Sequence, residues 1–163
     1  MAFDRSLIDK YEAGGEHLAQ AIRGLTREDL LAAPPPGENI GKWTIQQVVI
    51  HLMDSELISM DRMKRLISMP NPLLVGYDEN LFIQHLMPEE QSAEDAVTIL
   101  TLAYKNFARV LRKLPDEAFN RQGTHNERGP VTLGDYLAHM VKHMEHHLKF
   151  IHAKRAAMGK EMW

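Results

Sequence analysis

The sequence of 163 residues contains no cysteine. The protein can therefore form no disulfide bond, has no thiolate of its own to act as a nucleophile, and cannot build a zinc site with sulfur ligands. Nine histidines are present, and together with the carboxylates they are the side chains left to bind a transition metal. Any metal site in this chain is expected to have nitrogen and oxygen ligands.

A strong charge of either sign and long apolar runs are also absent. Nineteen Lys and Arg residues against 22 Asp and Glu residues give a formal net charge of −3, so the basic surface typical of nucleic-acid binders is not indicated. No apolar run approaches the roughly 20 residues of a membrane-spanning helix, and residues 1–10 lack the layout of a signal peptide. We expect a cytoplasmic protein that binds neither nucleic acid nor membranes.

The rest of the composition is that of an ordinary globular protein. Apolar residues make up 44% of the chain and charged residues 25%, which is enough to fold around an apolar core. The length fits one domain, and the sequence shows no internal repeat. We therefore expect residues 1–163 to form a single domain.

Four long segments carry apolar residues at helical spacing and end at glycine or proline. They cover residues 4–23, 44–68, 92–114 and 132–158. Such helices can cover their apolar faces only by packing together, which predicts an all-α four-helix bundle. Short extra helices are expected in the loops, at 26–32 and 78–86, and no segment shows the alternation of a strand. The order of the helices in the bundle stays open.

Five of the nine histidines lie in the fourth helix, at positions 139, 143, 146, 147 and 152. His143 and His147 are four residues apart, a spacing that lets two imidazoles reach one ion. His147 falls at the edge of the apolar stripe of this helix and His143 on its flank. The other three histidines point toward solvent. A surface or structural role is their simplest interpretation.

A third ligand has to come from another helix, because catalytic metal sites usually have three protein ligands. His51 flanks the apolar stripe of the second helix and is the candidate. From spacing alone, a metal triad of these histidines and purely structural roles for them are equally open. His125, in the loop before the fourth helix, could also approach the mouth of the bundle.

Two sequence motifs resemble those of the DinB-like superfamily of metal-binding four-helix bundles. The first runs from Gly41-Lys42-Trp43-Thr44 through Val48-Val49-Ile50-His51-Leu52 to Asp54-Ser55-Glu56, and the second from Gly129-Pro130-Val131-Thr132-Leu133 to His143-Met144-Glu145-His146-His147-Leu148. That superfamily includes the bacillithiol S-transferases, and it resembles the mycothiol-dependent maleylpyruvate isomerases. The resemblance implies that His51, His143 and His147 bind a divalent metal, zinc or nickel.

The same resemblance implies a metal-dependent enzyme that acts on a small molecule, either as a thiol S-transferase or as a hydrolase. A transferase would take its thiol from a low-molecular-weight cosubstrate. The alternative is a non-catalytic metal- or ligand-binding bundle, and a homodimer is expected in either case. One departure from the pattern is Phe150, since relatives often carry Gln three residues after the second ligand histidine. The polar contact of that Gln is missing here, which would make the site drier or change the contacts around the metal ligands.

Several further side chains are candidates for contacts around the metal. Glu56 falls near the middle of an apolar stripe, where a carboxylate without a partner is costly. It could contact the metal site, or, as we favour, form a buried pair with an Arg or Lys of a neighbouring helix. Ser55 is a candidate beside it. Trp43 could line a pocket, although we favour a hydrophobic staple over the first helical turn.

The remaining charged residues are interpreted as solvent-exposed surface. These are the run from Arg62 to Arg65 and the group Lys142, Lys149, Lys154 and Arg155.

Overall fold

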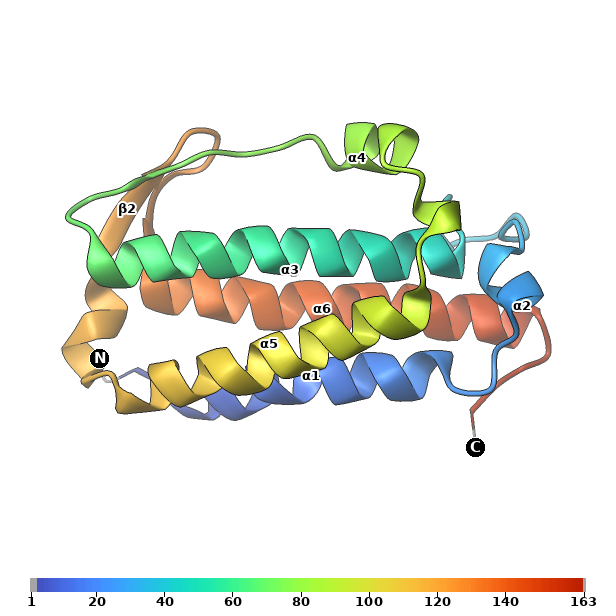
Figure 1. Ribbon diagram of the computed structural model, residues 1–163, viewed down its shortest axis with the longest axis horizontal. Coiled ribbons are helices and arrows are strands. Elements are labelled where there is room, and N and C mark those ends of the chain that lie inside the picture. Colours follow the sequence, from blue (N-terminus) through green and yellow to red (C-terminus); the bar gives the residue numbers. More distant parts are fainter. Residues whose placement is uncertain (1–2, 163) are drawn as a thin grey trace.

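The computed structural model describes residues 3–162. Four long helices packed side by side form most of it (Figure 1). They are α1 (Ser6–Ile22), α3 (Ile45–Ser68), α5 (Ala93–Lys113) and α6 (Leu133–Ala157). The prediction of an all-α four-helix bundle is confirmed. The short helices α2 (Arg27–Leu31) and α4 (Glu79–His85) occupy the two loop segments in which extra helices were expected.

The beginnings of α3, α5 and α6 are set by side-chain caps. The Thr44 hydroxyl accepts a hydrogen bond from the backbone N–H of Gln47 at 3.1 Å, and the Gln47 side-chain oxygen accepts one from the backbone N–H of Thr44 at 3.0 Å. Ser92 and Thr132 cap α5 and α6 with their hydroxyls. These caps satisfy backbone donors that have no partner within the helix. They fix where α3 and α6 begin, and hence which face each histidine occupies.

The order of the helices in the bundle, which the sequence left open, does not place α1 beside the next long helix, α3. Both α1 and α3 pack against α5 and α6, so α1 and α3 lie diagonally across the bundle. In Figure 1, α1 and α6 run in one direction and α3 and α5 in the other. The link from α3 to α5 therefore has to return along the whole bundle, and it carries α4 and the 3-10 helix η1 (Pro88–Glu90) on the way.

A small sheet closes one end of the bundle, so the expectation that no strand would form was wrong. It has the order β1 (Leu73–Leu74), β2 (Gln122–His125) and β3 (Gly129–Thr132). β1 is parallel to β2, and β2 pairs with β3 as an antiparallel hairpin. Between α5 and the hairpin lies the 3-10 helix η2 (Asp116–Asn120). The sheet ties the start of the long link to the loop that leads into α6.

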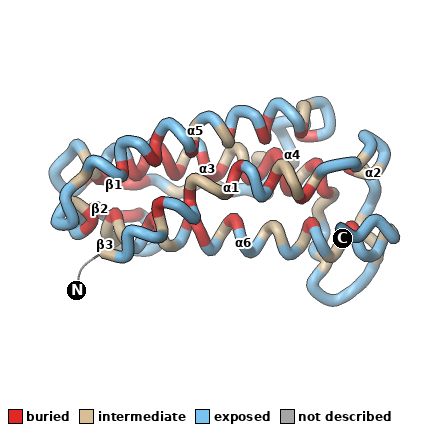
Figure 2. Tube along the Cα trace, turned by 90° about the horizontal axis from the view of Figure 1, so that it is seen from below, coloured by how far each residue is buried: buried red, intermediate tan, exposed pale blue. Residues whose placement is uncertain are grey.

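The core lies along the common axis of the four long helices, where buried residues face one another (Figure 2). Fully buried apolar side chains come from each helix, among them Leu18, Leu52, Leu100 and Leu137. α1 and α5 lie close together at Gly15, where an added Cβ atom would lie 2.7 Å from the Cα atom of Thr101. Within residues 3–162, none of the helices combines the length and apolar character needed to cross a membrane.

Candidate metal centre

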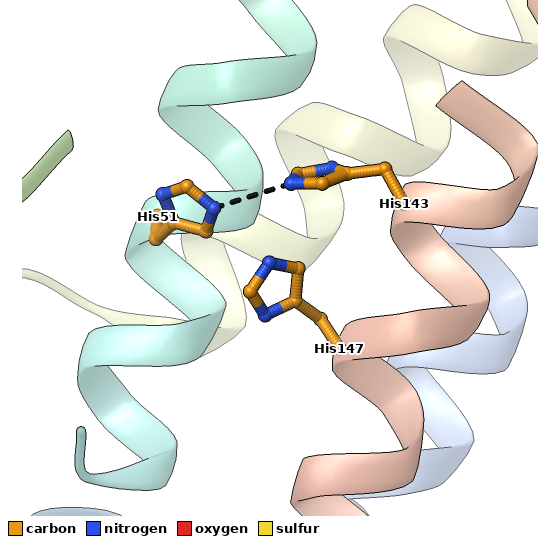
Figure 3. A group of neighbouring side chains, drawn as sticks. All are labelled: His51, His143 and His147. Atoms are coloured by element: carbon orange, nitrogen blue, oxygen red, sulfur yellow. Dashed lines mark hydrogen bonds between the residues drawn. The ribbon is translucent and has the colours of Figure 1, made fainter. Parts of the chain in front are cut away.

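The structure brings together the three histidines that the sequence singled out. His51 lies on α3, and His143 and His147 lie one turn apart on α6. Each offers a ring nitrogen, and these atoms all lie within 4.8 Å of one another. Figure 3 shows the three rings turned toward a common space between the two helices. In the part of the chain that the structure describes, no other cluster of three or more His, Asp or Glu side chains has this arrangement.

The separation of the ring nitrogens fits a shared ion. Nε2 of His51 lies 3.3 Å from Nε2 of His143. Two nitrogen ligands at about 2.0 to 2.1 Å from a tetrahedral ion are about 3.3 to 3.4 Å apart. Without an ion, this contact would be one weak hydrogen bond between His51 and His143, and it would not explain why the His147 ring faces the same space. The donor set is therefore suited to a divalent metal such as zinc or nickel.

The environment of the triad keeps the imidazoles of His51 and His147 neutral. Burial lowers the pKa of His51 to about 4, and the neighbouring His143 adds to this effect. Burial also lowers the pKa of His147 to about 2, with a further contribution from His143. A metal binds the neutral ring through its lone pair. At neutral pH, His51 and His147 are thus in the form that binds metal, with no proton to displace.

Glu56 lies directly behind His143, on the side away from the other two histidines. It is 0% exposed, and its Oε1 atom is 3.6 Å from Nδ1 of His143. Burial raises the pKa of Glu56, although His143 and Tyr104 partly oppose the shift. The favoured interpretation, a buried pair with Arg or Lys, was wrong, because the basic side chain that lies within 4.0 Å of Glu56 among the described residues is that of His143. A carboxylate behind a metal-binding imidazole orients the ring and raises its basicity.

One side of the triad opens into a cavity of about 230 Å³, which we call the tryptophan cavity. Its walls are formed by Gly41, Lys42, Trp43, Val48, Asn80, His147, Phe150 and Lys154. The Trp43 ring centre is 4.9 Å from that of His51, and the ring is nearly parallel to His147 at 6.5 Å. Trp43 therefore lines a cavity together with Val48, the residue that a staple over the first turn of α3 would contact. Phe150 lies on the same wall, 6.2 Å from the His147 ring centre.

The other side of the triad opens into a more polar cavity of about 140 Å³, the arginine cavity. Its lining consists of Ser55, Ser59, Arg62, Tyr77, Glu79, Arg128, Tyr136, His139, Met140 and His143. The predicted candidate Ser55 lies here, with its hydroxyl donating to the Leu52 carbonyl at 3.3 Å. The triad is thus reached from two directions, through His147 on one side and His143 on the other.

Arg62 is a residue of this cavity that the sequence interpretation missed. It was expected on the solvent-exposed surface, yet only 8% of it is exposed. Ser55, Ser59 and Arg62 follow His51 at spacings of four, four and three residues, so all four share one face of α3. That periodic row of polar residues was the signal that could have located Arg62.

His125 lies away from the triad. It is buried at the end of β2, and its Nδ1 atom accepts a hydrogen bond from the backbone N–H of Glu127 at 3.2 Å. Burial lowers the pKa of His125, and the positive charges of Arg62 and Arg128 lower it further. His125 is therefore not placed among the metal-binding candidates.

Two other charged residues of α6 also differ from expectation, because Lys154 and Arg155 are buried rather than solvated. The Lys154 ammonium donates to the carbonyl of Ile40. Arg155 donates to the carbonyls of Ala21 and Arg23, at 3.0 and 2.9 Å. Lys154 holds the loop before α3, and Arg155 holds the C-terminal end of α1, against the end of α6.

Known proteins that are similar to this chain have names that describe metal dependence. The family model described as the DinB superfamily matches residues 10–151. A protein of Oceanobacillus iheyensis named "Putative metal-dependent hydrolase OB0782" is 30% identical over 111 residues, which cover 68% of this chain and 64% of that relative. The Bacillus subtilis protein named "Putative metal-dependent hydrolase YfiT" is 29% identical over 120 residues, covering 73% of this chain and 67% of the relative.

Two solved structures share the fold. The structure of YfiT, described as a "probable metal-dependent hydrolase with an unusual four-helix bundle topology", has a TM-score of 0.86 and 27% identity and covers 94% of this chain and 86% of that one. The mycothiol-dependent maleylpyruvate isomerase has a TM-score of 0.67, covering 88% of this chain and 58% of that one. Its sequence identity of 9% shows a common fold alone.

Proposed function

Because the chain belongs to the DinB superfamily, we propose that it is a metal-dependent enzyme, a hydrolase or a thiol S-transferase, in which His51, His143 and His147 bind a divalent ion. Zinc and nickel are both suited to imidazole ligands. The observation that carries the proposal is the convergence of the three ring nitrogens within 4.8 Å in a place reached from two cavities. The names of the curated relatives support the same class of activity.

The residues of this chain supply binding, orientation and exclusion of water. When bound, a divalent ion acts as a Lewis acid that makes water or a thiol nucleophilic at neutral pH. The Glu56 carboxylate lies 3.6 Å from Nδ1 of His143, where it can orient the ring, and Trp43 and Phe150 form apolar walls of the cavity beside His147. Since the sequence has no cysteine, the thiol of a transfer reaction has to come from a small cosubstrate.

The metal content of the purified protein tests the triad. We expect about one divalent ion per chain in the wild type, and loss of that ion in His51→Ala, His143→Ala and His147→Ala. His152→Ala is the matched control, because His152 is an exposed histidine of the same helix. If the wild type binds no divalent ion, or if the three variants bind it as the control does, the triad is not the metal site.

Turnover tests the activity. We expect the metal-loaded protein to hydrolyse activated esters or amides, or to transfer a low-molecular-weight thiol to an electrophile, and we expect a chelator to abolish the reaction. The triad variants should be inactive and His152→Ala active. Full metal occupancy without turnover in either assay would contradict the enzymatic part of the proposal while leaving the metal site in place.

That last result would favour the second candidate, a non-catalytic metal-binding bundle that works as a homodimer. Exposed apolar side chains on the outer surface support it: Ile99, Leu102 and Val110 form a stripe on α5, and Leu57 lies beside them on α3. Sedimentation of the wild type and of Leu102→Glu tests this. A dimer that the substitution dissociates is expected, and a wild-type monomer would contradict the assembly.

A further inference from the structure

The arginine cavity holds a buried positive charge, Arg62, that pairs with no carboxylate of residues 3–162. Within residues 3–162, no Asp or Glu oxygen lies within 4.0 Å of the Arg62 guanidinium. The group donates to the Tyr136 hydroxyl at 2.9 Å and to the carbonyl of Val75. A guanidinium has five N–H donors, so donors remain after these two bonds. A buried charge of this kind is costly unless an anion joins it.

Other groups of the cavity point to the same kind of ligand. Arg128 lies on the wall, and no carboxylate oxygen of the described chain is within 4.0 Å of it; its Nη1 atom is 2.8 Å from Nε2 of His139. The Tyr77 hydroxyl is buried without a hydrogen-bond partner among the described residues. The acid of the lining, Glu79, is exposed at the rim. The lining therefore has two cationic side chains, Arg62 and Arg128, against one acidic side chain, Glu79. Arg62 is the most buried of the three.

The cavity connects this charge to the triad. On α3, the row from His51 to Arg62 spans eleven residues, or about 16 Å along the helix axis. On α6, Tyr136 and His143 are two turns apart, about 10 Å, and both line the cavity. A molecule bound at Arg62 can thus extend past the serines to His143. The cavity volume of about 140 Å³ suits a small organic molecule.

We propose that the arginine cavity binds the carboxylate of the substrate or cosubstrate, with Arg62 and Arg128 as its charged donors and the Tyr77 hydroxyl as a further donor. This inference rests on the proposed function in one respect, namely that the reacting end of the same molecule lies at the triad. Carboxylates match the planar fork of arginine donors. The substrate class is therefore a small carboxylic acid whose reacting group is several bonds from its carboxylate.

Calorimetric titration with pentanoate and with its neutral analogue pentanamide tests the site in the full-length protein. We expect pentanoate to bind and pentanamide to bind at least about 10-fold more weakly. Arg62→Met should weaken pentanoate binding about 10- to 100-fold, and Arg128→Gln about 10-fold. Glu79→Gln should strengthen it a few-fold, because a like charge leaves the rim. Arg65→Gln is the matched control, an exposed arginine of α3 paired with Asp61, and should change nothing.

Arg128 is exposed, so Arg128→Gln remains informative even if Arg62→Met fails to fold. The proposal is overturned if pentanoate binds no better than pentanamide, or if Arg128→Gln and any folded Arg62→Met bind it as the wild type does. His147→Ala separates the arginines from a bound metal. Its pentanoate affinity should stay within about twofold of wild type, and loss of binding would mean that the carboxylate binds at the triad instead.

Metal analysis of the same samples keeps the two proposals apart. A protein that binds pentanoate through its arginines but carries no metal would contradict the proposed function and support the carboxylate site. A protein with a full complement of metal and no preference for pentanoate would contradict the carboxylate site alone.

Discussion

Glu56 is a completely buried side chain whose carboxylate lies 3.6 Å from Nδ1 of a candidate metal ligand, His143. We predict that Glu56→Gln lowers the metal affinity about 10-fold or more, because the ring of His143 loses the carboxylate that orients it. The free energy of unfolding should not fall, since a neutral amide of the same shape replaces a group whose burial is costly. Competition with a chromogenic chelator measures the affinity, and urea unfolding measures the stability.

Glu145→Gln is the control for this prediction, because Glu145 is an exposed acid of α6 near the same histidines. It should leave both quantities unchanged. A purely structural Glu56 would show the reverse pattern, with lost stability and normal metal affinity.

Because Lys154 is buried, we predict that the free energy of unfolding depends measurably on pH. Burial lowers its pKa from 10.5 in the unfolded chain to about 8 in the folded protein. Between these values the unfolded chain binds more protons, so the free energy of unfolding rises with pH across this window. The stability of the wild type relative to Lys154→Met should be greater at pH 10 than at pH 7.5, by on the order of 1 to 3 kcal/mol.

Urea unfolding of both proteins at the two pH values measures this difference. The exposed neighbour Lys149 gives the control Lys149→Met, which should show no such dependence. Equal differences at pH 7.5 and pH 10 for Lys154→Met would contradict the prediction.

Single residues also mark the limits of what the sequence could predict about the site. His51, His143 and His147 could be selected because helical spacing and the two family motifs agree on them. Lys154 and Arg155 could not be placed correctly, because their partners are backbone carbonyls more than 100 residues away in the sequence. The sequence shows that a residue is charged but does not show which carbonyls will surround it.

At the scale of helices, the close approach of α1 and α5 depends on Gly15. Alanine is favoured over glycine inside a helix by about 1 kcal/mol, yet its Cβ atom would lie 2.7 Å from the backbone of Thr101. We predict that Gly15→Ala destabilises the protein by more than about 1 kcal/mol despite the better helix propensity. Thermal unfolding measures the effect.

The adjacent Gly14 provides the comparison. A Cβ atom there would lie 3.2 Å from a ring atom of Tyr104, which is a side chain and can shift. Gly14→Ala should therefore cost less than Gly15→Ala. The opposite ranking would show that backbone proximity does not control the packing of these two helices.

The helices were predictable and the strands were not, for a physical reason. The helices carry local signals, such as the capping box of Thr44 and Gln47 and apolar residues at regular spacing. The strands have two to four residues, too few to show alternation. β1 also pairs with a segment about 50 residues away in the sequence, and such pairing is set by the bundle rather than by local preference.

At the scale of the whole molecule, a metal at the triad would connect α3 to α6, which lie far apart in the sequence. We predict that saturating zinc raises the melting temperature of the metal-free protein by about 5 °C or more. An ion present at 100 times its dissociation constant stabilises the folded state by about 2.7 kcal/mol, and each kcal/mol shifts the melting temperature of a protein of this size by about 2 to 4 °C.

Thermal unfolding with zinc and with a chelator in excess measures the shift. His147→Ala should melt at the same temperature in both conditions. A shift in His147→Ala as large as that of the wild type would mean that zinc stabilises the protein at some other place.

The diagonal arrangement of α1 and α3 has a consequence for how the chain folds. α1 packs on α5 and α6. Even α5, the nearer of the two in the sequence, begins about 70 residues after α1 ends. No two consecutive long helices can form an antiparallel hairpin as a local first step. Folding has to wait for contacts between distant segments, so this bundle should fold more slowly than one whose helices alternate up and down. An α1–α3 hairpin formed early would be a misfolded state that must open before α5 can dock.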